Sequence, residues 1–281
     1  MSRRTPGLAC AALARCKCLG AVLLGGFGCF GTPTPLAPGL SGSVGWPHHG
    51  VQTGAIELPD AGDGFVRYRN EGGYYWGQPA LVHGIEEAAR QVNTAFPGGA
   101  PLVVGDLSAQ YGGKISRHQS HRTGRDVDLL WYVTTADGTS IRNSSFVPLR
   151  DAGFAKLPGK GPVRLDVARQ WMLIRSLLGS EHFEVQWLYS SAAVEAMVLD
   201  YAVAQSEDPE LVQRARDVML QPPESLPHDD HLHLRIACSP EASIQGCEGG
   251  GPHWSWLTPS PELAADNEGV ELLELLEAGG G

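Results

Sequence analysis

The stretch His231-Leu-His-Leu-Arg-Ile236 alternates polar and aliphatic residues and decides how the rest of the chain is interpreted. Successive side chains of a β-strand point to opposite faces of the sheet. One face here carries the two histidines and Arg235, and the other carries only aliphatic side chains. Because the aliphatic face belongs in a core, we expect a strand over 231–237 whose histidines point into a cleft or at a neighbouring strand. Two imidazoles at positions i and i+2 can serve one metal ion, or one can bind it while the other takes part in a reaction.

Earlier in the chain lies a second histidine-rich segment, Ser116-Arg-His-Gln-Ser-His-Arg-Thr-Gly-Arg-Asp-Val-Asp128. Its end begins a predicted strand in which Asp126 and Asp128 share one face and the neighbouring aliphatic residues share the other. His121 precedes Asp128 by seven residues, and a turn at Gly124 can fold it back toward that carboxylate. We therefore expect His121 and Asp128 to meet, with Asp126 orienting a ligating histidine.

Two histidines and one carboxylate form a three-ligand zinc site that leaves the fourth tetrahedral position for water. Zinc in such a site lowers the pKa of water from 15.7 to roughly 7 and polarises a peptide carbonyl, which is the chemistry of a hydrolase. A closed structural site would more often use cysteines, and neither segment contains one. We expect His118 either to contact substrate or to support a ligand. Asp230, three residues before His233, is expected on the opposite side of the strand, which argues against it as a catalytic base.

The remaining sequence predicts a mixture of helices and strands. Apolar stripes with a period of 3.6 residues predict the helices, two of which begin with a proline in the first turn. The helices are expected at 79–95, 163–178, 192–204 and 209–220. The further strands are expected at 65–68, 102–107, 126–133 and 183–189.

Both ends of the chain differ in composition from its middle. Residues 1–56 contain no acidic side chain, and 1–30 combine a basic start with a short apolar stretch, which predicts an export signal. That stretch is too short for a permanent transmembrane helix. Cys29 stands where a lipid-modified cysteine would sit, but Phe27 before it fits poorly, so lipid anchoring is not favoured. Residues 31–56 are rich in Gly, Pro and Ser and are expected to form a linker, and 259–281 form an acidic tail.

The cysteines and the net charge indicate which classes of protein this chain can belong to. Cys238 and Cys247 are the pair that remains once the leader is removed, and an isolated pair in an exported chain predicts a disulfide. The 21 basic and 31 acidic residues give a net charge of −10, which argues against binding to nucleic acid. The 42% of hydrophobic residues is enough for a packed core.

The two segments resemble those of the penicillin-insensitive murein endopeptidases, which are similar to lysostaphin-type enzymes and D-alanyl-D-alanine peptidases. The resemblance covers roughly residues 63–248. It includes Tyr75-Trp76-Gly77, Gly105-Asp106 and the glycine pair at 112–113, together with Ser-His-x-x-Gly-x-Asp-x-Asp128 and His228-x-x-His231-x-His233. The short cysteine loop after the last strand also matches.

This resemblance implies an α+β fold in which a small antiparallel sheet, flanked by helices and long loops, carries one Zn²⁺ per chain within a peptidase domain at 57–258. By position, His121, Asp128 and His233 would be the ligands. His231 would be the unligated histidine that acts on the water or the developing oxyanion, and His228 would assist. The implied substrate is the peptide cross-link of peptidoglycan, between D-alanine and a diamino acid, and the implied location is the periplasm or cell envelope.

Two other readings remain open. A D-alanyl-D-alanine carboxypeptidase or dipeptidase shares the same ligand pattern but often has a glutamate three residues before the last ligand, where this chain has Asp230. A cell-wall-binding module with a degenerate or structural zinc site is the non-enzymatic alternative. The general base and the oligomeric state are left undetermined by the sequence.

Overall fold

The computed structural model describes residues 42–69, 71–222, 227–249 and 254–257. The predicted export signal with Cys29, the first part of the expected linker and the acidic tail at 259–281 lie outside these residues.

A seven-stranded sheet forms the centre of the fold, in the order β14-β13-β15-β8-β7-β5-β4. Strand β15 lies between β13 and β8 and is antiparallel to both. The pairs β5–β7 and β13–β14 are parallel, so the sheet is mixed and larger than expected. The strands are β4 (Ala61–Gly62), β5 (Phe65–Arg67), β7 (Leu102–Val104), β8 (Asp126–Leu130), β13 (Val185–Tyr189), β14 (Met219–Leu220) and β15 (His231–Ile236).

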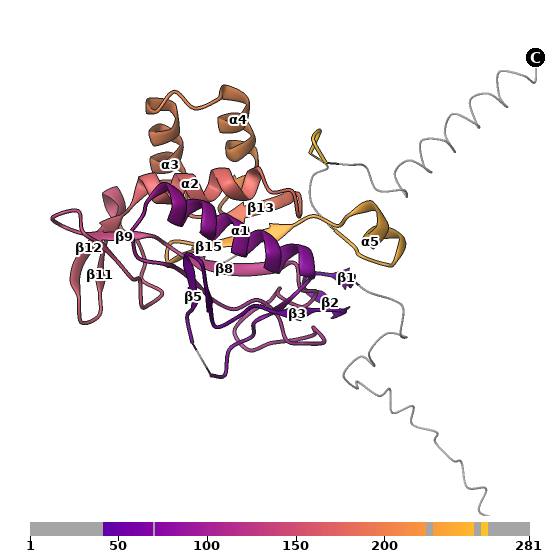
Figure 1. The fold of residues 1–281 in the computed structure, drawn as a ribbon. Coiled ribbons are helices and arrows are strands. Elements are labelled where there is room, and N and C mark those ends of the chain that lie inside the picture. The colour runs from indigo at the N-terminus through magenta and orange to yellow at the C-terminus, as the bar shows by residue number, and fades with distance from the viewer. Residues whose placement is uncertain (1–41, 70, 223–226, 250–253, 258–281) are drawn as a thin grey trace, which may run out of the picture. The chain divides into compact units, whose positions relative to one another are not determined.

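Helices α1 (Pro79–Ala95) and α2 (Val167–Leu178) pack against each other and cross the central sheet in Figure 1. Helices α3 (Ala192–Ala204) and α4 (Pro209–Val218) follow β13, and a short α5 (Pro240–Ile244) follows β15. The predicted α1 and α3 have the expected bounds. Polar side chains begin α2, α3, α4 and α5 by accepting a backbone N–H in the first turn; these are Asp166, Ser191, Asp208 and Ser239.

The aliphatic face of β15 lies in the core, as its alternation predicts. Leu232 and Leu234 are fully buried, and so are Val127 and Leu129 of β8. They belong to one hydrophobic cluster with the apolar stripes of α1 and α2. The opposite face of β8 and β15 is thereby turned away from the two helices.

Four further strands form a second sheet, in the order β10-β9-β12-β11. Its strands are β9 (Val133–Thr135), β10 (Ser140–Ile141), β11 (Phe154–Leu157) and β12 (Gly161–Leu165), and a 3₁₀ turn at Asp151–Gly153 precedes β11. The helix expected to start at residue 163 therefore starts at Val167. Residues 161–165 pair with β9 and β11 instead, and Asp166 accepts the N–H of Arg169 to begin the helix.

Residues 42–56, expected to belong to a linker, contain strands instead. Strands β1 (Gly42–Trp46) and β2 (His49–Thr53) form an antiparallel hairpin, and β3 (Ile56–Glu57) pairs with β6 (Trp76–Gly77). The hairpin is held by bonds to the loop before β8: Ser43 Oγ donates to the carbonyl of Thr123 (2.6 Å), and Gln52 Nε2 donates to that of Ala109 (2.7 Å). These strands are held by polar side chains that bond to a distant loop, so their sequence does not show the apolar alternation by which strands are predicted. For that reason they could not be predicted from the sequence.

None of the helices among the described residues has the length and apolar character needed to cross a membrane.

Candidate metal centre

One carboxylate oxygen, Asp128 Oδ1, lies among three imidazole nitrogens. His121 Nε2 and His231 Nε2 are each 3.3 Å from it, and His233 Nδ1 is 3.2 Å from it. Asp128 Oδ1 and His121 Nε2 are buried and have no hydrogen-bond partner within the described chain. Ligand atoms around a tetrahedral zinc ion, bound at about 2.0–2.1 Å, are about 3.3 Å apart. The donor types, their spacing and the two unpaired atoms therefore fit a divalent metal.

His121 is oriented by a strained turn and by a backbone carbonyl. Its φ of 63° lies in the left-handed region, which non-glycine residues seldom adopt. Its Nδ1 is 2.7 Å from the carbonyl oxygen of Leu107 and donates to it, so the lone pair of Nε2 is directed at Asp128. The turn at Gly124 is present with φ 73°, a left-handed backbone conformation that favours glycine.

His233 stands directly opposite Asp128 in the register of β15 and β8. Its Nε2 is 2.8 Å from Asp126 Oδ1, which leaves Nδ1 facing Asp128. Asp126 is fully buried and also accepts from Arg235 Nε at 2.7 Å. Burial alone would raise the pKa of Asp126, but Arg235 and His233 outweigh it and hold that pKa far below its usual range. Asp126 thus contacts one of the histidines predicted as ligands, and its orienting role stays a prediction.

His231 is the more exposed of the two β15 histidines, with a side-chain exposure of 16% against 7% for His233. Its Nδ1 is 2.5 Å from Asp230 Oδ1 and its Nε2 faces Asp128. Burial opposes protonation, yet Asp128 and Asp230 together raise the pKa of His231 to about 10. The expectation that Asp230 points away is wrong, because β15 begins at His231 and strand alternation does not extend to Asp230.

Asp106 is a site residue to which the sequence assigned no role. His118 Nε2 is 3.2 Å from Asp106 Oδ2, and His118 Nδ1 is 3.7 Å from Asp128 Oδ2. Burial of Asp106 is outweighed by His118 and the N–H of Tyr74, so its pKa is lowered. His118 therefore lies between two carboxylates, and both roles expected for it, contact with substrate and support of a ligand, stay predictions. The only sequence signal for Asp106 was its place in the family pattern.

His228 lies beside both β15 histidines. Its ring centroid is 5.3 Å from that of His231 and 5.7 Å from that of His233. Burial and the two neighbouring imidazoles lower the pKa of His228 to about 4. Tyr189 of β13, another residue that sequence analysis missed, stands 5.6 Å from it, centroid to centroid.

Two groups of three side chains among the described residues could each hold a metal ion. One is His118, His121 and Asp128, and the other is His228, His231 and His233.

The structure thus brings every predicted site residue into one cluster on the polar face of β8 and β15. The division of these residues into ligands and reacting groups stays a prediction. The predicted disulfide between Cys238 and Cys247 is confirmed. It closes the loop after β15, where the buried Arg125 donates to the carbonyls of Ile236 (3.3 Å) and Glu248 (2.8 Å).

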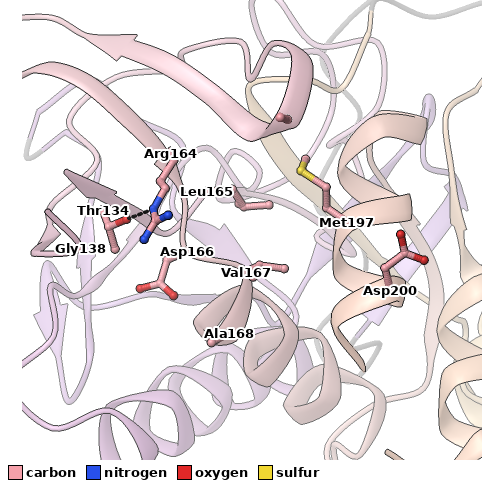
Figure 2. A pocket seen from close by; sticks show the side chains of 10 residues that line it. Thr134, Gly138, Arg164, Leu165, Asp166, Val167, Ala168, Met197 and Asp200 are labelled. Carbon is pink, nitrogen blue, oxygen red and sulfur yellow. Dashed lines mark hydrogen bonds between the residues drawn. The ribbon is translucent and has the colours of Figure 1, made fainter. Parts of the chain in front are cut away.

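A cavity of about 600 Å³ lies elsewhere, between β9, β12 and the first turns of α2 (Figure 2). Arg164 donates to Thr134 there, and Met197 and Asp200 of α3 close the other side. None of its lining residues is a histidine. The metal-binding side chains are therefore gathered at the sheet and not in this cavity.

Comparison with known proteins agrees with this geometry. Residues 43–253 match the family model described as penicillin-insensitive murein endopeptidase, from the β1–β2 hairpin through both histidine segments. A protein of that name from Haemophilus influenzae is 27% identical over 242 residues, covering 81% of this chain and 77% of the relative. One from Klebsiella pneumoniae is 26% identical over 216 residues, covering 76% and 72%. One from Escherichia coli is 32% identical over 110 residues, covering 39% of each.

Since the family model spans well over half of the sequence and includes the whole His/Asp cluster, the chain belongs to the penicillin-insensitive murein endopeptidase family.

Proposed function

We propose that this protein is a zinc-dependent endopeptidase that hydrolyses the peptide cross-links of peptidoglycan, between D-alanine and the diamino acid. The observation that carries the proposal is the convergence of three imidazole nitrogens on Asp128 Oδ1. Of these four atoms, Asp128 Oδ1 and His121 Nε2 are buried and have no hydrogen-bond partner within the described chain. The substrate follows from membership of the family. Since peptidoglycan lies outside the cytoplasmic membrane, the protein acts there, in agreement with the export signal predicted at 1–30.

Zinc would be held by His121 Nε2, Asp128 Oδ1 and His233 Nδ1. Of the three imidazoles that face Asp128, those of His121 and His233 are the more buried, with side-chain exposures of 1% and 7% against 16% for His231. Their far nitrogens contact the carbonyl oxygen of Leu107 and the buried carboxylate of Asp126. When bound, zinc supplies Lewis acidity that polarises the scissile carbonyl and acidifies water.

His231 is the group that accepts and donates the proton during hydrolysis. Asp230 holds its Nδ1, so Nε2, which faces Asp128, is the nitrogen that exchanges a proton. A base held by a third group is the arrangement that positions general acid–base catalysts. The same imidazole, once protonated, can donate to the leaving amine. His228, in ring contact with His231, assists at the site.

Purified cross-linked muropeptide dimers test the proposal. We expect the protein to convert dimers to monomers without releasing free D-alanine, as measured by liquid chromatography and mass spectrometry. A chelator should stop the reaction and added zinc should restore it, while Asp128→Ala should be inactive under both conditions.

Two other results would each replace the proposal. Release of terminal D-alanine with dimers left intact would identify a carboxypeptidase. Stoichiometric zinc without any cleavage between pH 5 and 9 would identify a wall-binding module.

A further inference from the structure

A row of four aromatic side chains extends from the metal centre along β13. Tyr189 pairs in register with His233, and Trp187 pairs with Arg235, so both share the face that carries the ligands. The ring centroids follow one another from His233 to Tyr189 (5.3 Å) and on to Trp187 (5.8 Å). Trp254 stands 5.2 Å from Trp187. Trp256 stacks on Trp254 at 5.2 Å and an interplanar angle of 4°. We call these four residues the aromatic row.

The aromatic row is fixed in place by neighbouring groups. Arg235 Nη1 donates to the hydroxyl of Tyr189 at 3.2 Å, and Trp254 Nε1 donates to the carbonyl of Gln186 at 2.9 Å. The guanidinium of Arg214 lies 5.4 Å from the ring centroid of Trp256. Rings held in this way lose little conformational entropy when a ligand binds, which favours binding.

Core packing does not account for Trp187. Leu188, on the opposite face of β13, is fully buried in the hydrophobic core. Trp187 and Tyr189 are only half-buried and stand outside that core cluster, whereas Trp254 and Trp256 pack against its edge. Two large aromatic rings beside a polar, metal-binding cluster indicate a ligand surface.

We propose that the aromatic row binds the glycan part of the substrate, with the sugar that carries the stem peptide stacked on Trp187. The proposal rests on the proposed function, because that substrate joins each cross-linked peptide to a sugar. A stem of about four residues, fully extended, spans about 13 Å. From a scissile bond at the metal centre, that length reaches past Tyr189 to Trp187.

The chemistry of a sugar fits the aromatic row. A pyranose ring has a face of C–H groups that packs on an aromatic ring, while its hydroxyls at the rim stay solvated or find polar partners. A half-buried indole offers such a face, and the strand places it beside Arg235. An extended peptide is often recognised by free backbone groups of a strand edge, but β13 pairs with β15 and, at Leu188 and Tyr189, also with β14.

Two versions of one substrate separate recognition of the sugar from cleavage of the peptide. One is the cross-linked dimer that retains its disaccharides, and the other is the same dimer after an amidase has removed the sugars. We expect the native protein to hydrolyse the sugar-bearing dimer with a higher kcat/KM. In Trp187→Ala the ratio of the two kcat/KM values should fall about tenfold. Trp187→Phe, which keeps an aromatic face, should retain most of the preference. Phe154→Ala, a half-exposed aromatic residue on β11, is the matched control and should keep the native ratio.

A binding measurement on metal-free protein gives a readout apart from turnover. By calorimetry, the sugar-bearing monomer should bind the native chain more tightly than the sugar-free peptide, and Trp187→Ala should remove that difference. Melting temperature and zinc content report whether each variant is folded. If Trp187→Ala lowers kcat/KM equally for both dimers, the ratio is unchanged and Trp187 has a peptide-binding or structural role, which would overturn the proposal. A variant with native kcat/KM for both dimers would overturn it as well. If neither dimer is cleaved by the native protein, the proposed function fails, while the binding data still decide the sugar site.

Discussion

Asp128 brings three imidazoles together, and each of them has its far nitrogen held by an oxygen. Those oxygens belong to Leu107 for His121, Asp126 for His233 and Asp230 for His231. Because His231 is as close to Asp128 as the two expected ligands are, distance alone does not separate its role from theirs. The larger exposure of His231 and its position outside the Asp128 register favour it as the group that meets substrate.

Metal content of single variants tests this division of roles. His121→Ala, Asp128→Ala and His233→Ala should each lose both zinc and activity, because each removes a ligand. His231→Ala should keep one zinc per chain and lose turnover by about 10²–10⁴-fold, the usual contribution of a positioned acid–base group. His83→Ala, an exposed histidine on α1, is the control and should change neither. Zinc retained in His233→Ala and absent from His231→Ala would reverse the assignment.

Strand β15 separates stability from chemistry by its two faces. Leu232 and Leu234 face the helices and are fully buried, while His231 and His233 face the metal centre. The strand is central in the sheet, so its register with β8 and β13 is fixed from both sides. A one-residue slip would exchange the two faces and remove the site.

Truncating the buried face should therefore cost stability without changing the ligands. Leu234→Ala should lower the free energy of unfolding by about 2–5 kcal/mol, because it leaves a cavity in a packed core. Urea denaturation measures this loss, and the folded variant should still bind one zinc per chain. Val203→Ala on α3, where the valine is 61% exposed, should change the unfolding free energy by less than about 0.5 kcal/mol. A similar small effect for Leu234→Ala would contradict the assignment of this face to the core.

Across the whole molecule, the metal centre connects segments that are distant in the sequence. The segment 116–128 and the strand that starts at His231 are brought together by the pairing of β8 with β15. The hairpin at 42–53 closes on that same loop through Ser43 and Gln52. A metal ion bound there would therefore stabilise the folded arrangement of all three segments.

Removing the metal should lower the melting temperature. A ligand present at 100 times its Kd stabilises the native state by about 2.7 kcal/mol, and about 2–4 °C of melting temperature corresponds to each kcal/mol in a chain of this size. We expect a decrease of at least about 5 °C on chelation, measured by differential scanning calorimetry, and recovery when zinc is added back. Asp128→Ala should melt at the same temperature with and without chelator. A native protein whose melting temperature ignores the chelator would argue against a bound metal that connects these segments.

The sequence alone determined what depends on local periodicity. The two faces of β15 and β8, helices α1 and α3, the disulfide, and the histidines at the site together with Asp126 and Asp128 could all be predicted. Side-chain alternation, helical stripes and capping residues are properties of neighbouring positions, so they are visible in one dimension. The family pattern added the distinction between ligands and reacting histidine, which periodicity does not contain.

Tertiary structure alone decided the contacts between distant segments. The β1–β2 hairpin depends on hydrogen bonds to the loop before β8, and the start of α2 depends on β12 pairing with β9. Asp106 and Asp230 join the site from loops, where side-chain direction follows no period. Tyr189 and Trp187 reach the site only through the register of β13 with β15. Such pairings are set by the free energy of the whole folded chain, and a local pattern carries no record of them.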